Sequence, residues 1–225
     1  MFRFARFIAL TLLWFIALSL IWVAIYTIVP PPTTITMLMD GEGATRDWMS
    51  LDDMDADMAR AAIAGEDGKF CQHNGFDGAA IAQAIQRNVT GARMRGGSTI
   101  SQQTAKNAFL WQGSGTFSRL ARKLPEAWFT LLIETMWGKR RIMEVYLNIA
   151  ETGIGTYGAN AGSQRYFRHD ASQLSRAEAA RIAAVLPLPK RRGAIDPRGQ
   201  TRRYGNRIAS RMAVVQRDGL DACLR

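Results

Sequence analysis

The sequence predicts a mostly α-helical protein that is held to a membrane by one helix at its amino terminus. Residues 7–29 contain no charged side chain, and a segment of this length can cross a bilayer. After residue 48, apolar residues recur at helical intervals almost to the end of the chain. A chain of 225 residues has room for one well-packed domain in addition to this anchor.

The uncharged segment reads "FIALTLLWFIALSLIWVAIYTIV" and would span about 35 Å as a helix. Arg3 and Arg6 precede it, so the positive-inside rule keeps the amino terminus in the cytoplasm and sends the remaining residues across the membrane. A cleaved signal peptide is the alternative, but its apolar region is normally shorter and ends in small residues, whereas this segment ends in Val29 and three prolines. We expect a cytoplasmic tail (1–6), a transmembrane anchor (7–29), a linker with strand-like Thr and Ile alternation (30–48) and one folded domain (49–225).

The charge of the chain indicates an anionic partner. Lys and Arg outnumber Asp and Glu by 29 to 19, which gives a formal net charge of +10. Arg203, Arg207 and Arg211 are spaced four apart, and this spacing makes nucleic-acid binding one alternative. An anchor that carries the domain out of the cytoplasm argues against it, so we expect no nucleic acid.

We expect no metal site. His73 and His169 are too far apart in the sequence to form a helical metal pair. Asp53, Asp55 and Asp57 resemble the D-x-D pattern of metal-dependent sugar transferases, but they stand at a predicted helix start with no strand before them. Capping of that helix is the better interpretation.

The chain has two cysteines, Cys71 and Cys223, and both fall in the part that we place outside the cytoplasm. One pair in a domain of this size is not a disulfide framework. The plain interpretation is two unpaired thiols, and their pairing stays open.

The stretch "GEDGKFCQHNGFDG", residues 65–78, places Glu66 and Asp67 directly before an aromatic residue, a histidine and a glycine-rich turn. A second stretch, "RGGSTISQQTAKNAFL", opens a helix with a capping box formed by Thr99 and Gln102. Its exposed amides meet Ser98 and favour an anion, although a capped surface helix would look similar. One face of this helix carries a polar strip that could hold a phosphate or a sugar: Gln103, Lys106 and Asn107.

A third stretch, "RKLPE", combines cations with a carboxylate. Arg122, Lys123 and Glu126 share one face if this segment is helical, although surface ion pairs often produce the same pattern. Proline is tolerated in the first turn of a helix and breaks an interior turn. Pro125 therefore predicts that Glu126 lies near a helix start.

A carboxylate next to cations, in a domain that follows a membrane anchor, fits the transfer of a sugar from a lipid-linked donor. A sugar hydroxyl that attacks an anomeric carbon needs a base, and a carboxylate can supply it. A diphosphate leaving group needs little proton donation, so Arg and Lys can stabilise the developing charge in place of a general acid. These residues are typical of a glycosyltransferase that uses a sugar linked to a lipid diphosphate.

Four ordered blocks also resemble a known family. "EDGKFCQHNGFD", "GGSTISQQTAKN", "RKLPE" and "KRRIMEVYLN" are similar to the motifs of the peptidoglycan glycosyltransferase family, which is shared with the amino-terminal domains of bifunctional penicillin-binding proteins. No penicillin-binding domain follows, so the resemblance is to the monofunctional members. It implies an α-helical, lysozyme-like fold with two lobes, of which the smaller lies against the membrane.

The resemblance also implies roles for individual residues. Glu66 would deprotonate the GlcNAc 4-hydroxyl of the acceptor for an inverting attack on the donor, and Glu126 would organise the donor side. No cofactor is implied, and dependence on a divalent cation stays open. The matching positions linked to the donor phosphate and sugar are Ser98, Gln103, Lys106, Arg122 and Lys123.

The partners that the resemblance implies are lipid II (a disaccharide-pentapeptide on undecaprenyl diphosphate), the growing glycan, membrane lipids and other cell-wall or division proteins. The implied location is the bacterial inner membrane, with the catalytic domain in the periplasm. Aromatic and basic residues around position 110 could lie on the bilayer. Core packing would explain these apolar residues equally well: Phe109, Leu110, Trp111 and Phe117.

Two other functions stay open. A lytic transglycosylase or muramidase would share the fold and a catalytic glutamate, but it would cleave glycan and would not need the cationic blocks. A non-catalytic scaffold for cell-wall enzymes is the other alternative, and the intact Glu66 and Glu126 argue against it.

Overall fold

The computed structural model describes residues 2–79, 81–82, 86, 97–112 and 115–225, without the side chains of residues 116, 117 and 119. The predicted mostly helical fold with one apolar amino-terminal helix is confirmed. The α-helices are α1 (Phe2–Ile28), α2 (Ile35–Leu38), α3 (Ala56–Glu66), α5 (Ile100–Phe109), α6 (Thr116–Met136), α7 (Lys139–Ile149), α8 (Ala159–Phe167), α9 (Arg176–Val185) and α10 (Gly199–Arg217). The 3-10 helices are η1 (Phe70–Gln72), η2 (Ala171–Gln173) and η3 (Ala222–Leu224), and the strands are β1 (Thr45–Arg46), β2 (Glu151–Gly153) and β3 (Thr156–Tyr157).

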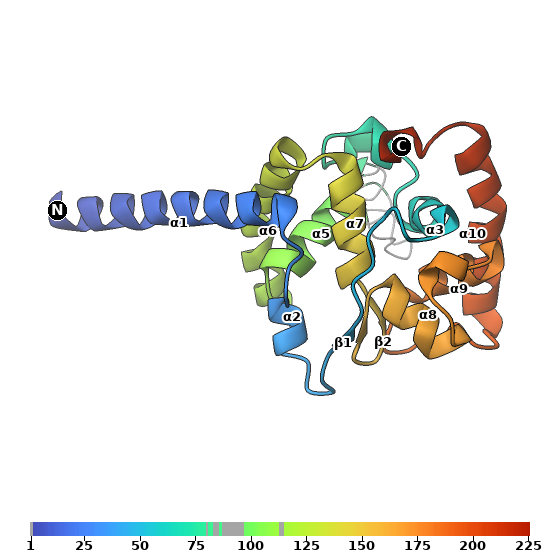
Figure 1. The fold of residues 1–225 in the computed structure, drawn as a ribbon. Helices are drawn as coiled ribbons and strands as arrows, with labels where there is room; N and C mark the ends of the chain where they lie inside the picture. Colours follow the sequence, from blue (N-terminus) through green and yellow to red (C-terminus); the bar gives the residue numbers. More distant parts are fainter. Residues whose placement is uncertain (1, 80, 83–85, 87–96, 113–114) are drawn as a thin grey trace.

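The helices pack in two groups (Figure 1). Helices α3, α9 and α10 pack against one another on the side of the molecule away from α1, whereas α5, α6 and α7 form the group next to α1. The buried face of α9 consists mainly of alanines, which let its neighbours approach closely. The end of α3 meets α5 between the two groups, and this junction holds the candidate site.

A small sheet joins the linker to the domain. Strand β1 pairs in parallel with β3, and β2 pairs antiparallel with β3, in the order β1-β3-β2. The prediction of a strand from the Thr and Ile alternation in the linker is wrong, because Thr34 instead caps the short helix α2. Its Oγ1 accepts a hydrogen bond of 3.2 Å from the Met37 amide. Met37 is buried, so packing favours the helical turn over an extended strand.

Helix α1 is both apolar and attached to the domain. Among the described residues it is the one helix that is long and apolar enough to cross a bilayer, with a mean hydropathy of 2.6 over its most apolar window. Near its end, the Trp128 indole donates to Ser19 Oγ at 3.0 Å, and the Trp137 indole donates to the Val23 carbonyl at 2.9 Å. The end of α1 is therefore packed into the fold (Figure 1).

Two of the residues expected at the bilayer surface lie in the core. Phe109 and Leu110 are buried, so the prediction that they reach the membrane is wrong. Phe109 stacks on Phe129 with ring centroids 4.6 Å apart and meets Trp22 of α1 edge-on at 5.3 Å. Trp111 is exposed, and the side chain of Phe117 lies outside the described residues.

Candidate active site

Glu66 is the last residue of α3. This helix begins where the Asp55 carboxylate accepts a hydrogen bond of 2.8 Å from the Asp57 amide, and its Ala-rich body is buried. Asp57 in turn forms ion pairs with Arg60 and Arg176. Capping and ion pairing thus account for Asp55 and Asp57, and among the described residues no group of three or more His, Cys, Asp or Glu side chains could hold a metal ion.

Asp67 fixes the end of α3 against the start of α5. Its carboxylate accepts a hydrogen bond of 3.0 Å from the Ile100 amide, the first of α5, and lies 3.0 Å from His73 Nε2. A carboxylate at a helix start is stabilised by the helix dipole. Asp67 is buried in this structural role, and its neighbour Glu66 is left facing the site.

The capping box predicted for α5 is present, with both the Thr99 and the Gln102 side-chain bonds formed. The helix turns its polar strip toward a cavity of about 320 Å³. Gln103 Nε2 donates a hydrogen bond of 3.0 Å to Glu66 Oε2, so the strip and the carboxylate meet. The predicted residues Gln103, Lys106 and Asn107 all line this cavity, together with Tyr146, Glu151 and Lys190.

The pKa values of the two central charges move in opposite directions. Burial raises the pKa of Glu66, while the hydrogen bond from Gln103 and the charges of Arg192 and Lys106 act against this rise. Burial lowers the pKa of Lys106, while the carboxylates of Glu126 and Glu66 act against it. Glu66 Oε1 is buried and accepts no hydrogen bond from a described residue, so its lone pairs are not used within the described part of the chain.

The third block lies in the interior of α6. Glu126 is buried; Lys123 Nζ donates a hydrogen bond of 2.7 Å to Glu126 Oε1, and Arg122 Nε lies 3.8 Å from Oε2. The prediction that Pro125 marks a helix start is wrong, because α6 begins at Thr116 and continues through the proline. An interior proline disfavours a helix by about 3 kcal/mol, and the packing of α6 on α1 and α5 offsets this loss.

Ser98 lies on a different wall of the site. It lines a hollow of about 140 Å³, and Glu66 and Asp67 line the same hollow. The cavity lined by Lys106 does not include Ser98, and the two hollows meet at Glu66 and Gln103. The predicted binding residues Arg122 and Lys123 line neither of these two hollows.

Comparison with known proteins shows the family to which this chain belongs. Residues 33–213 match the model of a family described as "Transglycosylase". The chain belongs to this transglycosylase family. It is 46% identical over 205 residues to the biosynthetic peptidoglycan transglycosylase of Caulobacter vibrioides, covering 90% of this chain and 88% of the relative. The protein of the same name from Pseudomonas aeruginosa is 47% identical over 195 residues, covering 83% of this chain and 82% of the relative.

The match to the transglycosylase family confirms the resemblance seen in the four blocks, and it confirms the enzyme class.

The sequence did not reveal every residue of the site. Tyr146 is one residue that it missed: it is buried, its hydroxyl has no hydrogen-bond partner among the described residues, and it lines the same cavity as Lys106. Tyr204 was also missed, and its hydroxyl donates to the Gly65 carbonyl at 2.8 Å, directly behind Glu66.

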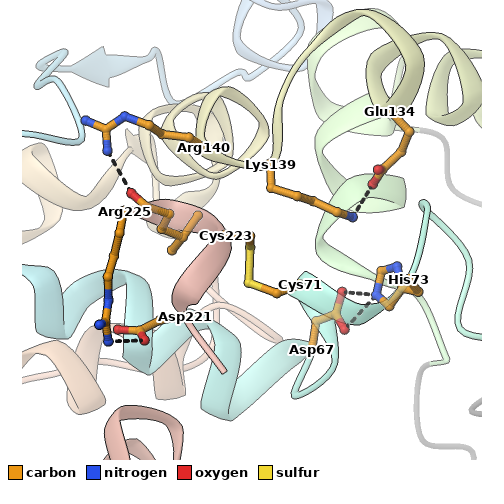
Figure 2. The surroundings of a disulfide bond; sticks show 10 residues. Asp67, Cys71, His73, Glu134, Lys139, Arg140, Asp221, Cys223 and Arg225 are labelled. Carbon is orange, nitrogen blue, oxygen red and sulfur yellow. Dashed lines mark hydrogen bonds and ion pairs between the residues drawn. A yellow bond between two sulfur atoms is a disulfide. The ribbon is translucent and has the colours of Figure 1, made fainter. Parts of the chain in front are cut away.

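In this member of the transglycosylase family, the carboxyl terminus is bonded covalently to the loop after Glu66. Cys71 and Cys223 form a disulfide, so the interpretation as unpaired thiols is wrong. Asp221 and Arg225 form an ion pair beside it, and Arg140 of α7 donates to the Leu224 carbonyl at 2.9 Å (Figure 2). Local sequence could not reveal this pairing, because the two cysteines are 152 residues apart.

Removal of the disulfide should lower stability. Because it closes a loop across 152 residues, its loss should reduce the free energy of unfolding by about 2–4 kcal/mol. The measurement is chemical unfolding of the detergent-solubilised protein with and without a reductant. The Cys71→Ser/Cys223→Ser double variant should behave like the reduced protein and should not respond to the reductant. Equal stability of the oxidised and reduced protein would contradict the pairing.

Proposed function

We propose that this transglycosylase polymerises lipid II into peptidoglycan strands. The observation that carries this proposal is the position of Glu66, with one free carboxylate oxygen, next to a cavity lined by the polar strip of α5. The names of the relatives support peptidoglycan as the product.

The proposed step is a single displacement. Glu66 takes the proton of the GlcNAc 4-hydroxyl, and the oxygen attacks the anomeric carbon of the donor from the face opposite the diphosphate. One carbon–oxygen bond forms while the bond to undecaprenyl diphosphate breaks with its electron pair, so the configuration inverts. Lys106, Arg122 and Lys123 stabilise the charge that develops on the diphosphate, and Glu126 holds the last two in place.

Ser98, Gln103 and Asn107 complete the proposed binding site. Gln103 orients Glu66 through its 3.0 Å hydrogen bond, and Asn107 lines the cavity beside Lys106. Ser98 lines the smaller hollow beside Glu66, where its hydroxyl can meet a substrate hydroxyl or phosphate. No step in this mechanism requires a cofactor.

The proposed location is the bacterial inner membrane, with residues 1–6 in the cytoplasm and the enzyme domain in the periplasm. Helix α1 fits an anchor, and Arg3 and Arg6 favour this orientation. The disulfide supports it, because such bonds persist in oxidising compartments. We include membrane lipids among the partners, because Leu120 and Leu124 of α6 are exposed on the helix that packs against α1.

Assays with two substrates distinguish an enzyme that synthesises glycan from one that cleaves it. The detergent-solubilised protein should convert labelled lipid II into long glycan and should release no fragments from purified sacculi. Release of muropeptides without glycan synthesis would favour a lytic transglycosylase instead. Inactivity on both substrates, in a folded protein, would favour the scaffold.

The acid limb of the pH profile of kcat/KM should depend on Gln103. Since Glu66 acts as a base, the rate should fall as the pH falls through its raised pKa. Gln103→Leu removes a hydrogen bond to the charged form, so the pKa of Glu66 should rise further and the acid limb of kcat/KM should move up by as much as about one pH unit. Gln112→Leu is the matched control, because Gln112 lines the same cavity and bonds Asn107 instead. An unmoved limb in Gln103→Leu would contradict this role.

A further inference from the structure

A hollow between the end of α3 and α10 is not used by the mechanism above. Its volume is about 380 Å³, and residues 64–68 form one wall. Arg211, Val214, Val215 and Leu220 form the other. Glu66 therefore borders this hollow as well, on a wall that faces α10 and not the polar strip of α5.

The walls of the hollow combine one cation with aliphatic side chains. Arg211 is exposed and makes no hydrogen bond or ion pair with any described residue. Val214 is partly exposed beside it on the same face of α10, and Leu220 is half-buried. A ligand that carries a carboxylate next to small apolar groups matches these walls.

The cation belongs to a longer strip. Arg203, Arg207 and Arg211 stand four residues apart on one face of α10, and this helix contains no acidic residue. Like charges at this spacing destabilise a helix, so the strip is not explained by helix stability. Several arginines elsewhere are paired with carboxylates, such as Arg60 with Asp221 at 2.9 Å. The α10 strip has no carboxylate partner among the described residues, which leaves its charge available to a ligand.

The strip also reaches the residues behind Glu66. The guanidinium carbon of Arg207 lies 5.6 Å from the centre of the Tyr204 ring, and that of Arg192 lies 5.7 Å from it. The Tyr204 hydroxyl donates to the Gly65 carbonyl, so these cations surround a ring that is bonded to the chain next to Glu66. The strip thus lies next to the chain segment that carries Glu66.

The position of α10 indicates where this anion comes from. Helix α10 lies along the side of the molecule opposite to the one from which α1 emerges (Figure 1). The lipid headgroups of a bilayer around α1 would lie on the other side of the molecule from α10, and so would a diphosphate held at that surface. The ligand has to extend into the aqueous phase.

We propose that the hollow and the arginine strip of α10 bind the carboxylate-bearing peptide of the substrate. This inference rests on the proposed function, because lipid II and its glycan carry a short peptide with free carboxylates and small apolar side chains. Arg211 binds a peptide carboxylate, and Val214 with Leu220 contacts the apolar side chains. A peptide held there keeps its disaccharide beside Glu66.

The test changes both partners of the contact. Lipid II and a form of it with amidated peptide carboxylates are compared with the full-length protein in detergent. Amidation should raise the KM of the wild type about tenfold, with little change in kcat. Arg211→Gln should raise the KM for normal lipid II by a similar factor and should make the enzyme indifferent to amidation, while Arg211→Lys should restore part of the discrimination.

Arg217→Gln is the matched control, because it removes the same charge from the same helix but does not line the hollow, and Arg217 is paired with Asp218 at 2.7 Å. It should discriminate between the two substrates like the wild type. Equal KM values of the wild type for both substrates would overturn the proposal. So would an Arg211→Gln variant that loses affinity for both substrates equally, because the arginine would then bind another anion such as the diphosphate.

Binding without turnover separates this inference from the proposed function. The water-soluble disaccharide-pentapeptide should bind the wild type more tightly than Arg211→Gln by about tenfold in calorimetry, and its amidated form should bind both proteins equally weakly. This result would support the peptide site even if lipid II were not polymerised. Equal binding of the peptide by both proteins would overturn it even if polymerisation were observed.

Discussion

Glu66→Gln should lower the rate of glycan polymerisation by about 10²- to 10⁴-fold, which is the usual contribution of a positioned general base. Glutamine keeps the shape of the side chain and can still bond Gln103, but it cannot accept the proton of the attacking hydroxyl. The buried Oε1 of Glu66, which has no hydrogen-bond partner among the described residues, is the atom that this substitution removes as a base. The measurement is the initial rate of polymer formation from labelled lipid II.

The control for this prediction is Glu144→Gln. Glu144 forms an ion pair of 2.6 Å with Arg141 on α7 and lines none of the hollows around Glu66, so the same chemical change there should leave the rate within about twofold of the wild type. A Glu66→Gln variant that keeps more than about a tenth of the wild-type rate would show that Glu66 is not the base.

Lys106→Met should lower kcat by about 10²- to 10³-fold, as expected for the loss of one group that stabilises charge in the transition state. Methionine retains the apolar stem of the side chain. No described residue hydrogen-bonds the Lys106 ammonium or forms an ion pair with it, so its charge is free for a ligand, although the fields of Glu66 and Glu126 act on it. The effect should appear mainly in kcat, because the charge on the diphosphate grows as its bond breaks.

Lys190→Met is the comparison for Lys106. Lys190 lines the same cavity, but it is more exposed and is already paired with Asp40 at 3.3 Å and Glu151 at 3.7 Å. Its loss should lower kcat by less than about tenfold. Equal effects of the two substitutions would mean that the cavity contributes only general positive charge, and a Lys106→Met variant with normal kcat would remove this residue from the mechanism.

Local patterns predicted the parts of the site that lie within one helix. The capping box of Thr99 and Gln102 and the polar strip of α5 could be predicted because i, i+3 and i, i+4 spacing puts side chains on one face. The hydrogen bond between Gln103 and Glu66 joins residues 37 positions apart, and the sequence contains no local signal for it.

The wrong predictions have a common physical cause, which is tertiary packing. Pro125 continues a helix because the flanking turns of α6 pack on α1 and α5. Phe109 turns inward because α1 brings Trp22 and Tyr26 to its ring, and a sequence cannot tell an interfacial aromatic from a core aromatic without that neighbour. Cys71 and Cys223 meet only because the chain returns to the end of α3 after 152 residues.

The most direct test of the account is the configuration of the new glycosidic bond made from lipid II by the wild-type protein, determined by nuclear magnetic resonance of the glycan. We expect inversion relative to the lipid-linked donor, because in the proposed mechanism Glu66 acts as a base in one displacement and no covalent intermediate forms. Retention of configuration would contradict it, since two displacements would then be needed and Glu66 would have to act as a nucleophile.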